Sequence, residues 1–457
     1  MLRRFICLLA LALALPVTAT EAQRPTPTDS IVRELGRLRR QIDSLRRVTE
    51  RQDERIMSLD ERASAAPASR ASADSTSRPL STTRGIYGKP FVRRFGSGTA
   101  VGGYVSTEYR SEYVNRLRTR RSAFDQHRLV PFIFSEITDR LHFGTEIEFE
   151  HGTKLEVDNG EASGAGEINI EFATLDYRFL EALNFRAGVI LSPIGRFNLT
   201  HDDPINELTD RPLVARQVIP GTLGETGAGF FGTLYPSERS LVTYEAYVVN
   251  GFTDKLVDLA PGVRRLAVRE AAGTRGAEPS ATKNLVGRLG FSPILGLEAG
   301  ASVHTGKYGD GLGTTGGDDE ERSATIVALD GSWRRGPFEV IGEAARLRAD
   351  LSDALTNAGV SNGRQGYYLQ ANYRFGQGLL HPKPTSLFTG VLRWDQVDFA
   401  TGITGDEQRR LTLGLNWRPI GDAAFKSEYQ WNWTTSAGTT ERSPAEKRLL
   451  LSLAAYF

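Results

Sequence analysis

Hydrophobic and polar residues alternate with a period of two over most of residues 97–457. In the clearest segment, Phe425 and Tyr429 fall on one face, and Lys426 and Glu428 fall on the other. Successive side chains of a β-strand point to opposite sides, so this pattern predicts strands with one apolar and one polar face. Helical spacing is absent from this part of the chain.

The alternation divides into sixteen segments, each long enough for a strand. They are residues 98–110, 122–138, 140–151, 165–178, 182–192, 225–236, 238–250, 283–292, 294–305, 321–335, 337–349, 364–376, 384–399, 406–418, 421–434 and 445–457. Short turns, such as 335–337, alternate with long loops, such as 193–224 and 251–282. This alternation is typical of transmembrane barrels and predicts a 16-stranded antiparallel transmembrane β-barrel. A soluble β-sandwich is the alternative, because its strands also alternate.

The first 22 residues have the features of a secretory signal peptide. Arg3 and Arg4 precede an apolar run over residues 5–15, and small residues follow Pro16. That run is shorter than the roughly 20 residues that span a bilayer as a helix. Cleavage near residue 22 removes Cys7, the single cysteine of the chain, so no disulfide is expected in the mature protein.

Residues 29–62 show a heptad repeat instead of the two-residue alternation. The seam positions are Ile31, Leu35, Leu38, Ile42, Leu45, Thr49, Gln52, Ile56 and Leu59. Apolar seams flanked by charged residues predict a coiled coil, with one helix packed on a neighbouring domain as the alternative. Residues 63–96 are rich in Ala, Ser, Thr and Arg without periodicity, which predicts a disordered linker before the barrel at 97–457.

Formal charge argues against a nucleic-acid partner, because the whole chain of 457 residues carries only +1. Eight excess positive charges lie before residue 97, so the predicted barrel carries seven excess negative charges. Inward-facing charge is divided between an acidic wall and basic residues near one rim. The acidic candidates are Glu146, Glu148, Glu150, Glu167 and Glu171. The basic candidates are Arg186, Arg288, Arg374 and Arg418.

A barrel of sixteen strands encloses an aqueous channel too wide for side chains to fill. The long loop 193–224 combines charged residues with proline-fixed turns and is expected to fold inward and narrow the channel. Its constriction candidates are Arg196, His201, Asp202, Asp203, Asp210, Arg211 and Arg216. The sequence predicts no metal site and no cofactor, because one histidine beside two loop carboxylates is ordinary loop chemistry.

The stretch around loop 193–224, the heptad segment and the final strand resemble the phosphate-selective porin O and P family and related trimeric outer-membrane porins. The final strand, 445–457, ends on the aromatic Phe457 but has Ala455 where the family's pattern has an outward aromatic. The resemblance implies a trimer, a periplasmic coiled coil and the third loop inside the pore. It also implies an outer-membrane location among lipid and lipopolysaccharide, with Phe457 read by the barrel assembly machinery.

Taken together, the residues favour a diffusion pore with opposed charged walls and no catalytic function. An outer-membrane barrel enzyme is an alternative, but the six histidines show no companion pattern for a catalytic triad. A barrel that serves mainly as a cell-wall tether is the other alternative. Anion or cation selectivity stays open at this stage, because a basic ladder in the lumen is not evident.

Overall fold

The computed structural model describes most of the predicted barrel and a short stretch before it. The described residues are 93–95, 98–114, 119–152, 155–158, 161–164, 166–219, 221–258, 265–266, 268–271, 283–308, 322–380 and 386–457. The predicted signal peptide, the coiled coil and the linker as far as residue 92 lie outside them. The last linker residues, Arg93–Phe95, form the short strand β1, which pairs with the start of the first long strand.

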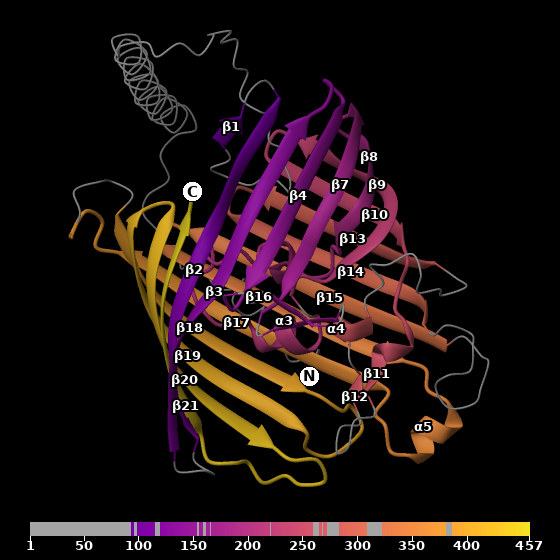
Figure 1. The fold of residues 1–457 in the computed structure, drawn as a ribbon, viewed down its shortest axis with the longest axis vertical. Helices are drawn as coiled ribbons and strands as arrows, with labels where there is room; N and C mark the ends of the chain where they lie inside the picture. The colour runs from indigo at the N-terminus through magenta and orange to yellow at the C-terminus, as the bar shows by residue number, and fades with distance from the viewer. Residues whose placement is uncertain are drawn as a thin grey trace, which may run out of the picture. The chain divides into compact units, whose positions relative to one another are not determined.

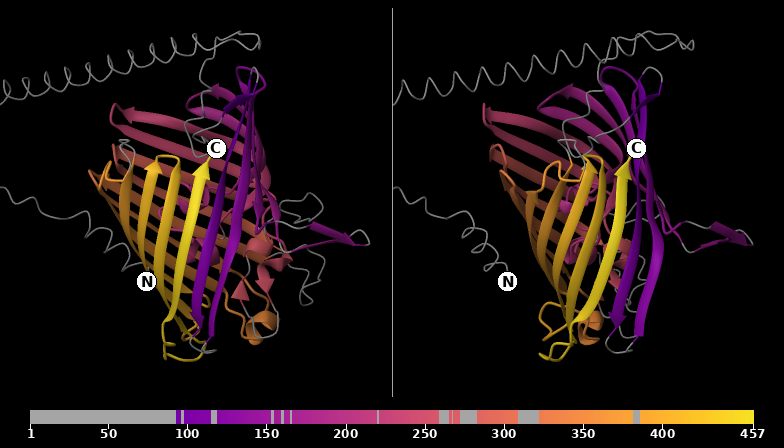
Figure 2. Two further views of the ribbon diagram at one scale, coloured as in Figure 1. Left: turned by 60° about the vertical axis from the view of Figure 1, so that its left-hand side comes forward. Right: turned by 90° about the vertical axis from the view of Figure 1, so that its left-hand side faces the viewer.

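Sixteen long strands form one closed antiparallel sheet (Figures 1 and 2). They are β2 (Thr99–Val114), β3 (Thr119–Glu136), β4 (Leu141–Glu150), β7 (Ile168–Leu180), β8 (Leu183–Leu191), β9 (Gly224–Ser237), β10 (Ser240–Val249), β13 (Asn284–Ile294), β14 (Leu297–Tyr308), β15 (Arg322–Arg335), β16 (Phe338–Ala349), β17 (Gly363–Phe375), β18 (Leu387–Asp398), β19 (Glu407–Ile420), β20 (Ala423–Thr435) and β21 (Glu446–Tyr456). Each strand pairs with its sequence neighbours, and β2 also pairs with β21, which closes the barrel.

The sequence-based fold prediction is confirmed: every one of the sixteen expected segments is a strand of the barrel. The turn between β13 and β14 is at Leu295–Gly296, slightly later than the alternation suggested. Gly296 has a φ of 85°, a conformation that glycine adopts without steric cost, and this fixes where the chain reverses. Small elements occupy the loops: β5 (Leu155–Asp158), β6 (Glu161–Gly164), η1 (Phe197–Leu199), α3 (Leu213–Gln217), η2 (Asp254–Leu256), β11 (Val257–Asp258), β12 (Arg265–Leu266), α4 (Val268–Ala271) and α5 (Asp353–Asn357).

The outer face of the barrel is apolar and aromatic. Phe291, Leu413, Phe425 and Leu453 are exposed there, and the ring of Phe425 stacks on Trp417 at 5.3 Å between ring centroids. An exposed apolar band of this kind is unstable in water and is stabilised by lipid. No helix in the described part of the chain is long and apolar enough to cross a membrane.

A β-bulge on β7 changes which residues face inward. Glu146 pairs with Phe172 and Ile147 pairs with Ile170, so Glu171 is the extra residue. A bulge inserts one residue into one strand and shifts its alternation. Glu171 and Phe172 are therefore both buried inside the barrel. Strict alternation from Ile168 and Ile170 predicts Phe172 on the outer face, and this prediction is wrong because the bulge turns Phe172 inward.

Candidate functional site

The interior of the barrel is occupied in large part by the segment that joins β8 to β9. This segment, residues 192–223, is called the inner loop below. Most of its residues are buried, including Ile194, Phe197, His201 and Asp210. Its backbone and side chains make hydrogen bonds to inward-facing residues on strands far apart around the wall. The loop therefore crosses the lumen.

The inner loop begins against β14 and β16. Glu343 of β16 accepts hydrogen bonds of 2.8 Å from the backbone N–H groups of both Arg196 and Phe197. Gly195 donates its N–H to the Ser302 hydroxyl at 2.9 Å. Gly195 has a φ of 70°, and a Cβ there would lie 2.5 Å from Glu343 Oε1. Glycine is favoured at this position, because any side chain would strain the backbone and displace the Glu343 carboxylate from its hydrogen bonds.

Asp203 ties the middle of the inner loop to β2 and β3. Its carboxylate accepts a hydrogen bond of 2.5 Å from the Ser106 hydroxyl and one of 2.9 Å from Arg128 Nη1. Burial alone would raise the pKa of Asp203, but the positive charges of Arg128, His127 and Lys426 lower it. The net pKa of this carboxyl lies well below its usual range, so it stays ionised at neutral pH.

Asp210 ties the loop to β19 and β20. These strands lie on the other side of the junction between β2 and β21, called the barrel seam below, from β3. Its carboxylate accepts hydrogen bonds from Arg410 Nη1 at 2.6 Å, Arg216 Nη1 at 2.9 Å and Gln430 Nε2 at 3.1 Å. Burial raises the pKa of Asp210, and the Arg410 and Arg216 guanidinium groups lower it well below its usual range. Asp210 is therefore a buried, charged anchor with its countercharges in place.

Further wall residues bind the loop backbone. Lys426 donates to the carbonyl oxygen of Asp203 at 2.5 Å, and Glu428 accepts the N–H of Thr209 at 2.9 Å. Arg418 donates to the carbonyl oxygen of Pro204 at 2.6 Å, while Asn416 donates to the carbonyl oxygen of Glu207. Because loops carry backbone groups that need partners when buried, these wall side chains make the buried path of the loop possible.

His201 is turned toward β4 and β7. Its Nε2 lies 2.8 Å from Glu171 Oε2, and its Nδ1 lies 2.8 Å from the carbonyl oxygen of Asn198. Glu146 lies beside this pair, and one ligand atom from each of Glu146, Glu171 and His201 lies within 4.8 Å of the others. These three residues are the group in the described part of the chain with the composition and spacing to hold a metal ion.

One part of the lumen is filled by apolar side chains. Val214 and Ile219 of the inner loop pack in one apolar cluster with Phe252 and Leu256 from the following long loop. Inward-facing residues of the wall complete the cluster, among them Val286, Ile326, Leu347 and Val397. The sequence pattern predicts the inner loop inside the barrel but does not predict the second loop there. A signal was present, since residues 326–329 of β15 are continuously apolar, as in strands buried on both faces.

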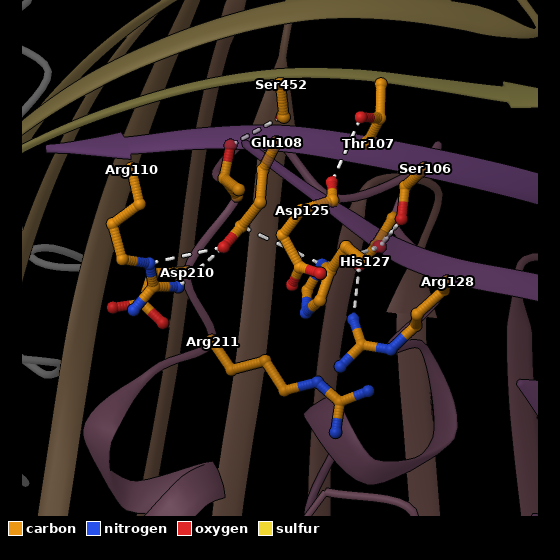
Figure 3. Close-up of polar contacts among 12 residues, drawn as sticks. Ser106, Thr107, Glu108, Arg110, Asp125, His127, Arg128, Asp210, Arg211 and Ser452 are labelled. Atoms are coloured by element: carbon orange, nitrogen blue, oxygen red, sulfur yellow. Dashed lines mark hydrogen bonds and ion pairs between the residues drawn. The ribbon is translucent and has the colours of Figure 1, made fainter. Parts of the chain in front are cut away.

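The charged part of the interior lies beside β2 and β3 (Figure 3). Arg110 Nε donates to Glu108 Oε1 at 3.2 Å, and His127 Nδ1 lies 3.4 Å from Asp203 Oδ2. Arg211 of the inner loop approaches from the other side. Its Nη2 lies 3.8 Å from Glu148 Oε1. Acidic and basic groups therefore face one another across this part of the lumen.

Two cavities, each of about 230 Å³, lie along the inner wall. The first is lined by Arg186, Arg288, Glu245 and Asp330, with Arg196 at its edge. The second also includes Arg196 and is lined by Arg334, Glu339, Asn372, Arg374 and Arg393. Both cavities combine guanidinium and amide or carboxylate groups, so each offers donors and acceptors to a small hydrophilic solute.

The four arginines expected at the rim all face inward, and each is held by a carboxylate. Arg186 binds Asp176 at 2.7 and 2.6 Å, and Arg288 binds Asp330 at 2.5 and 2.7 Å. The remaining pairs are Arg374 with Glu339 at 2.6 Å and Arg418 with Glu207 at 3.3 Å. These pairs neutralise much of the positive charge that the sequence pattern suggested.

The five glutamates expected to form an acidic wall are distributed unequally. Glu146, Glu148 and Glu171 are buried, and Arg128 binds Glu148 at 2.5 Å and Glu150 at 2.8 Å. Glu167 is exposed and lies immediately before β7. Residues that the sequence analysis did not select are as important for holding the loop, namely Arg128, Glu343, Arg393, Asp395, Arg410, Lys426 and Glu428. The sequence signal that could have identified these residues was their position on the polar face of the alternating strands.

Three comparisons with known proteins were made, and a solved outer-membrane channel, DcaP, supports the barrel fold. No protein-family model matches the chain. An uncharacterised protein of Aquifex aeolicus (strain VF5) is 27% identical over 343 residues, which cover 73% of this chain and 75% of that protein. The outer-membrane channel DcaP of Acinetobacter baumannii superposes with a TM-score of 0.53 at 12% identity, covering 80% of this chain and 99% of DcaP. For an anion-selective porin from Comamonas acidovorans the TM-score is 0.49 at 12% identity, and the match covers 79% of this chain and 99% of that porin.

The architecture is that of a porin-type barrel: sixteen antiparallel strands, an apolar outer wall and a loop folded across a partly polar interior. At 12% identity the likeness to DcaP concerns the fold alone.

Proposed function

We propose that the chain is an outer-membrane porin through which small hydrophilic solutes or ions diffuse passively, with the inner loop as the constriction. The observation that carries the proposal is the inner loop, which is hydrogen-bonded around the inner wall of a closed barrel. The charged region beside β2 and β3 and the two cavities that Arg196 lines are proposed as parts of a hydrated path around it. Catalysis has no comparable support, because the buried histidines are placed to hold loops.

The constriction is proposed to lie between the inner loop and β2, β3 and β4. Arg216 has a side chain that is 42% exposed, and Arg110 and Glu112 are 29% and 25% exposed. His201, Asp202, Asp203 and Asp210 are anchors of the loop under this proposal, and Arg196, Arg211 and Arg216 carry its charge toward solutes. Glu150 of β4 is proposed to lie on the part of the wall that faces these arginines across the constriction.

Selectivity is proposed to be weak, because most lumen charges are paired with an opposite charge. Arg128 lies among Glu148, Glu150 and Asp203, so its field is largely cancelled. Strong preference for phosphate or for anions in general, which the sequence resemblance raises as a possibility, would need a run of unpaired basic groups. A reversal potential near zero in a KCl gradient is the expected result.

We further infer an outer-membrane location with the N-terminal segment in the periplasm, and a homo-oligomer, with a trimer as the form to test. An even strand number places both ends of the barrel on one side of the membrane. Lipid and lipopolysaccharide would contact the apolar wall. The terminal Phe457, whose backbone N–H donates to the carbonyl of Gly103 at 2.9 Å, is proposed as the contact for the assembly machinery.

Single-channel recording in planar bilayers tests the proposal. Stepwise openings are expected from the wild-type protein, and persistent silence of correctly folded protein would contradict a pore. The chain has one cysteine, Cys7, so a cysteine introduced by Arg216→Cys can be modified selectively. A charged thiol reagent should then lower the conductance. Leu295→Cys is the matched control, since Leu295 is fully exposed on a turn outside the lumen, and its modification should leave the conductance unchanged.

A further inference from the structure

A buried cluster of two carboxylates and an imidazole joins the inner loop to the barrel wall. Glu146 comes from β4, Glu171 from β7 and His201 from the inner loop. All three side chains are buried, with relative exposures of 0%, 1% and 1%. One ligand atom from each residue lies within 4.8 Å of the other two. A carboxylate–carboxylate–imidazole set at this spacing has the composition of a transition-metal site.

The bulge on β7 is what brings the two carboxylates together. With regular alternation, Glu171 and Phe172 would point to opposite faces of the sheet. The extra residue at Glu171 instead aims both side chains inward, with Glu171 beside Glu146 of the neighbouring strand. Bulges commonly re-aim a side chain next to a functional site. Two ionised carboxylates side by side in a buried site repel each other, so either one of them is protonated or a cation lies beside them.

The hydrogen bonds of His201 orient its ring as in metal sites. The carbonyl oxygen of Asn198 can only accept, so the Nδ1 that lies 2.8 Å from it carries a proton. The 2.8 Å hydrogen bond between Nε2 and Glu171 Oε2 needs one shared proton, and a metal ion that replaced this proton would be bound by both atoms. An Nδ1–H bonded to a backbone carbonyl, with Nε2 left for the metal, is the usual arrangement of a ligating histidine. Asn198 is itself fixed by bonds to Ser192 and Leu223.

We propose that Glu146, Glu171 and His201 bind one divalent metal ion of the zinc class, which ties the inner loop to the barrel wall. The three residues supply one nitrogen and two or more oxygen ligands, and a further position remains for water. Ligand atoms around a tetrahedral zinc ion lie roughly 3.4 Å apart, so a small rearrangement of these side chains accommodates it. Magnesium and calcium fit less well, because they prefer sites made of oxygen atoms alone.

A second buried His–Glu pair in the same barrel provides a matched control. His304 Nε2 lies 3.0 Å from Glu225, and both side chains are fully buried. The ring of His304 stacks on Phe252 at 4.3 Å, and Ser192 donates to Glu225 at 3.2 Å. No third His, Cys, Asp or Glu ligand atom completes this pair among the described residues. It should behave as an ion pair without metal.

The experiment is a zinc titration of the full-length protein, folded in detergent and stripped of metal with EDTA. Calorimetry on the wild type should show one tight site per chain. Glu146→Gln, Glu171→Gln and His201→Gln should each weaken zinc binding at least tenfold, and His304→Gln should leave it unchanged. Heat-dependent migration on gels checks that each variant is folded.

Two results would overturn the proposal. One is a wild-type zinc affinity no higher than that of a Glu146→Gln/Glu171→Gln double variant, which would indicate a simple imidazolium–carboxylate ion pair. The other is an equal loss of binding in His304→Gln. Should the variants fail to fold, zinc X-ray absorption of the wild type decides: a spectrum with imidazole and oxygen scattering supports the site, and one without imidazole refutes it.

Discussion

Arg128 on β3 donates a hydrogen bond of 2.9 Å to Asp203 of the inner loop, and both groups are almost fully buried. This pair connects the wall next to the barrel seam with the middle of the loop. Because Lys426 on β20 also binds the backbone of Asp203, the loop is held from both sides of the seam at one residue. The stability of the constriction should therefore be sensitive to this carboxylate.

Replacing Asp203 by Asn should loosen the inner loop without unfolding the barrel. The amide cannot balance the charge of Arg128, although Glu148 and Glu150 remain close to it. We expect a loss of about 1–3 kcal/mol in the free energy of unfolding, the cost typical of a disrupted buried charged hydrogen bond. Open-channel current noise should increase. Arg409→Gln is the control, because Arg409 and Glu407 are both partly exposed and the loss of their ion pair should cost less than about 1 kcal/mol.

Acid should release the loop only well below neutral pH. The pKa values of Asp203 and Asp210 are both lowered in the folded protein. Their contribution to stability is therefore complete above the ordinary aspartate pKa of about 3.9 and is lost as the pH falls through the lower folded values. The difference in the free energy of unfolding between the wild type and Asp203→Asn should therefore stay constant from pH 8 to pH 5 and shrink below about pH 3.9. A difference that is already lost near pH 6 would contradict this assignment.

Gly195→Ala should destabilise the start of the inner loop for two separable reasons. The residue has a positive φ, and its new Cβ would lie 2.5 Å from Glu343 Oε1. Gly336 also has a positive φ, of 58°, but has no heavy atom within 4 Å of an added Cβ. Backbone strain alone costs roughly 1–2 kcal/mol, so Gly336→Ala should show that loss and Gly195→Ala a larger one. Denaturant unfolding in detergent measures both, and equal losses would contradict the steric argument.

Phe172→Ala tests the consequence of the bulge. Phe172 packs inside the barrel with Leu191 and Leu199, so its truncation should leave a cavity and cost about 3–5 kcal/mol. Phe291 faces outward and is exposed. Lipid or detergent fills the space that Phe291→Ala leaves, so that only the transfer free energy of about 1–2 kcal/mol is lost. A smaller loss for Phe172→Ala than for Phe291→Ala would place Phe172 on the outer face.

The strands could be predicted because two-residue alternation is imposed directly by the two environments of the wall. Rows such as Lys426–Glu428–Gln430 inside and Phe425–Tyr429 outside follow this rule without exception in the structure. The bulge at Glu171 could not be predicted, since it depends on pairing with Glu146 on another strand. One inserted residue reverses the orientation of every side chain that follows in the strand.

The location of the candidate site could be predicted from the sequence, but the wall residues that bind the inner loop could not. Loop 193–224 was recognised from its length and charge, and its residues lie inside the barrel as expected. Many loop residues contact strands more than 100 positions away in the sequence, such as Arg410 for Asp210 and Glu343 for Arg196, and no local pattern predicts these pairs. The entry of Phe252 and Leu256 into the apolar cluster was missed because a short, isolated apolar pair has no periodicity to detect.

The pairing of β2 with β21 has a consequence for how the molecule reaches its final form. Val105 lies in register opposite Ala455, roughly 350 positions further along the chain, whereas every other pair of long strands joins neighbours in the sequence. Hairpins between neighbouring strands can form one after another, because each closes a short loop at small entropic cost. Pairing the first long strand, β2, with the last, β21, is the one step that joins residues far apart in the sequence. Until that step is complete, both margins expose unpaired backbone groups and are open to pairing with other chains, so protection of these margins should limit the yield of folded protein.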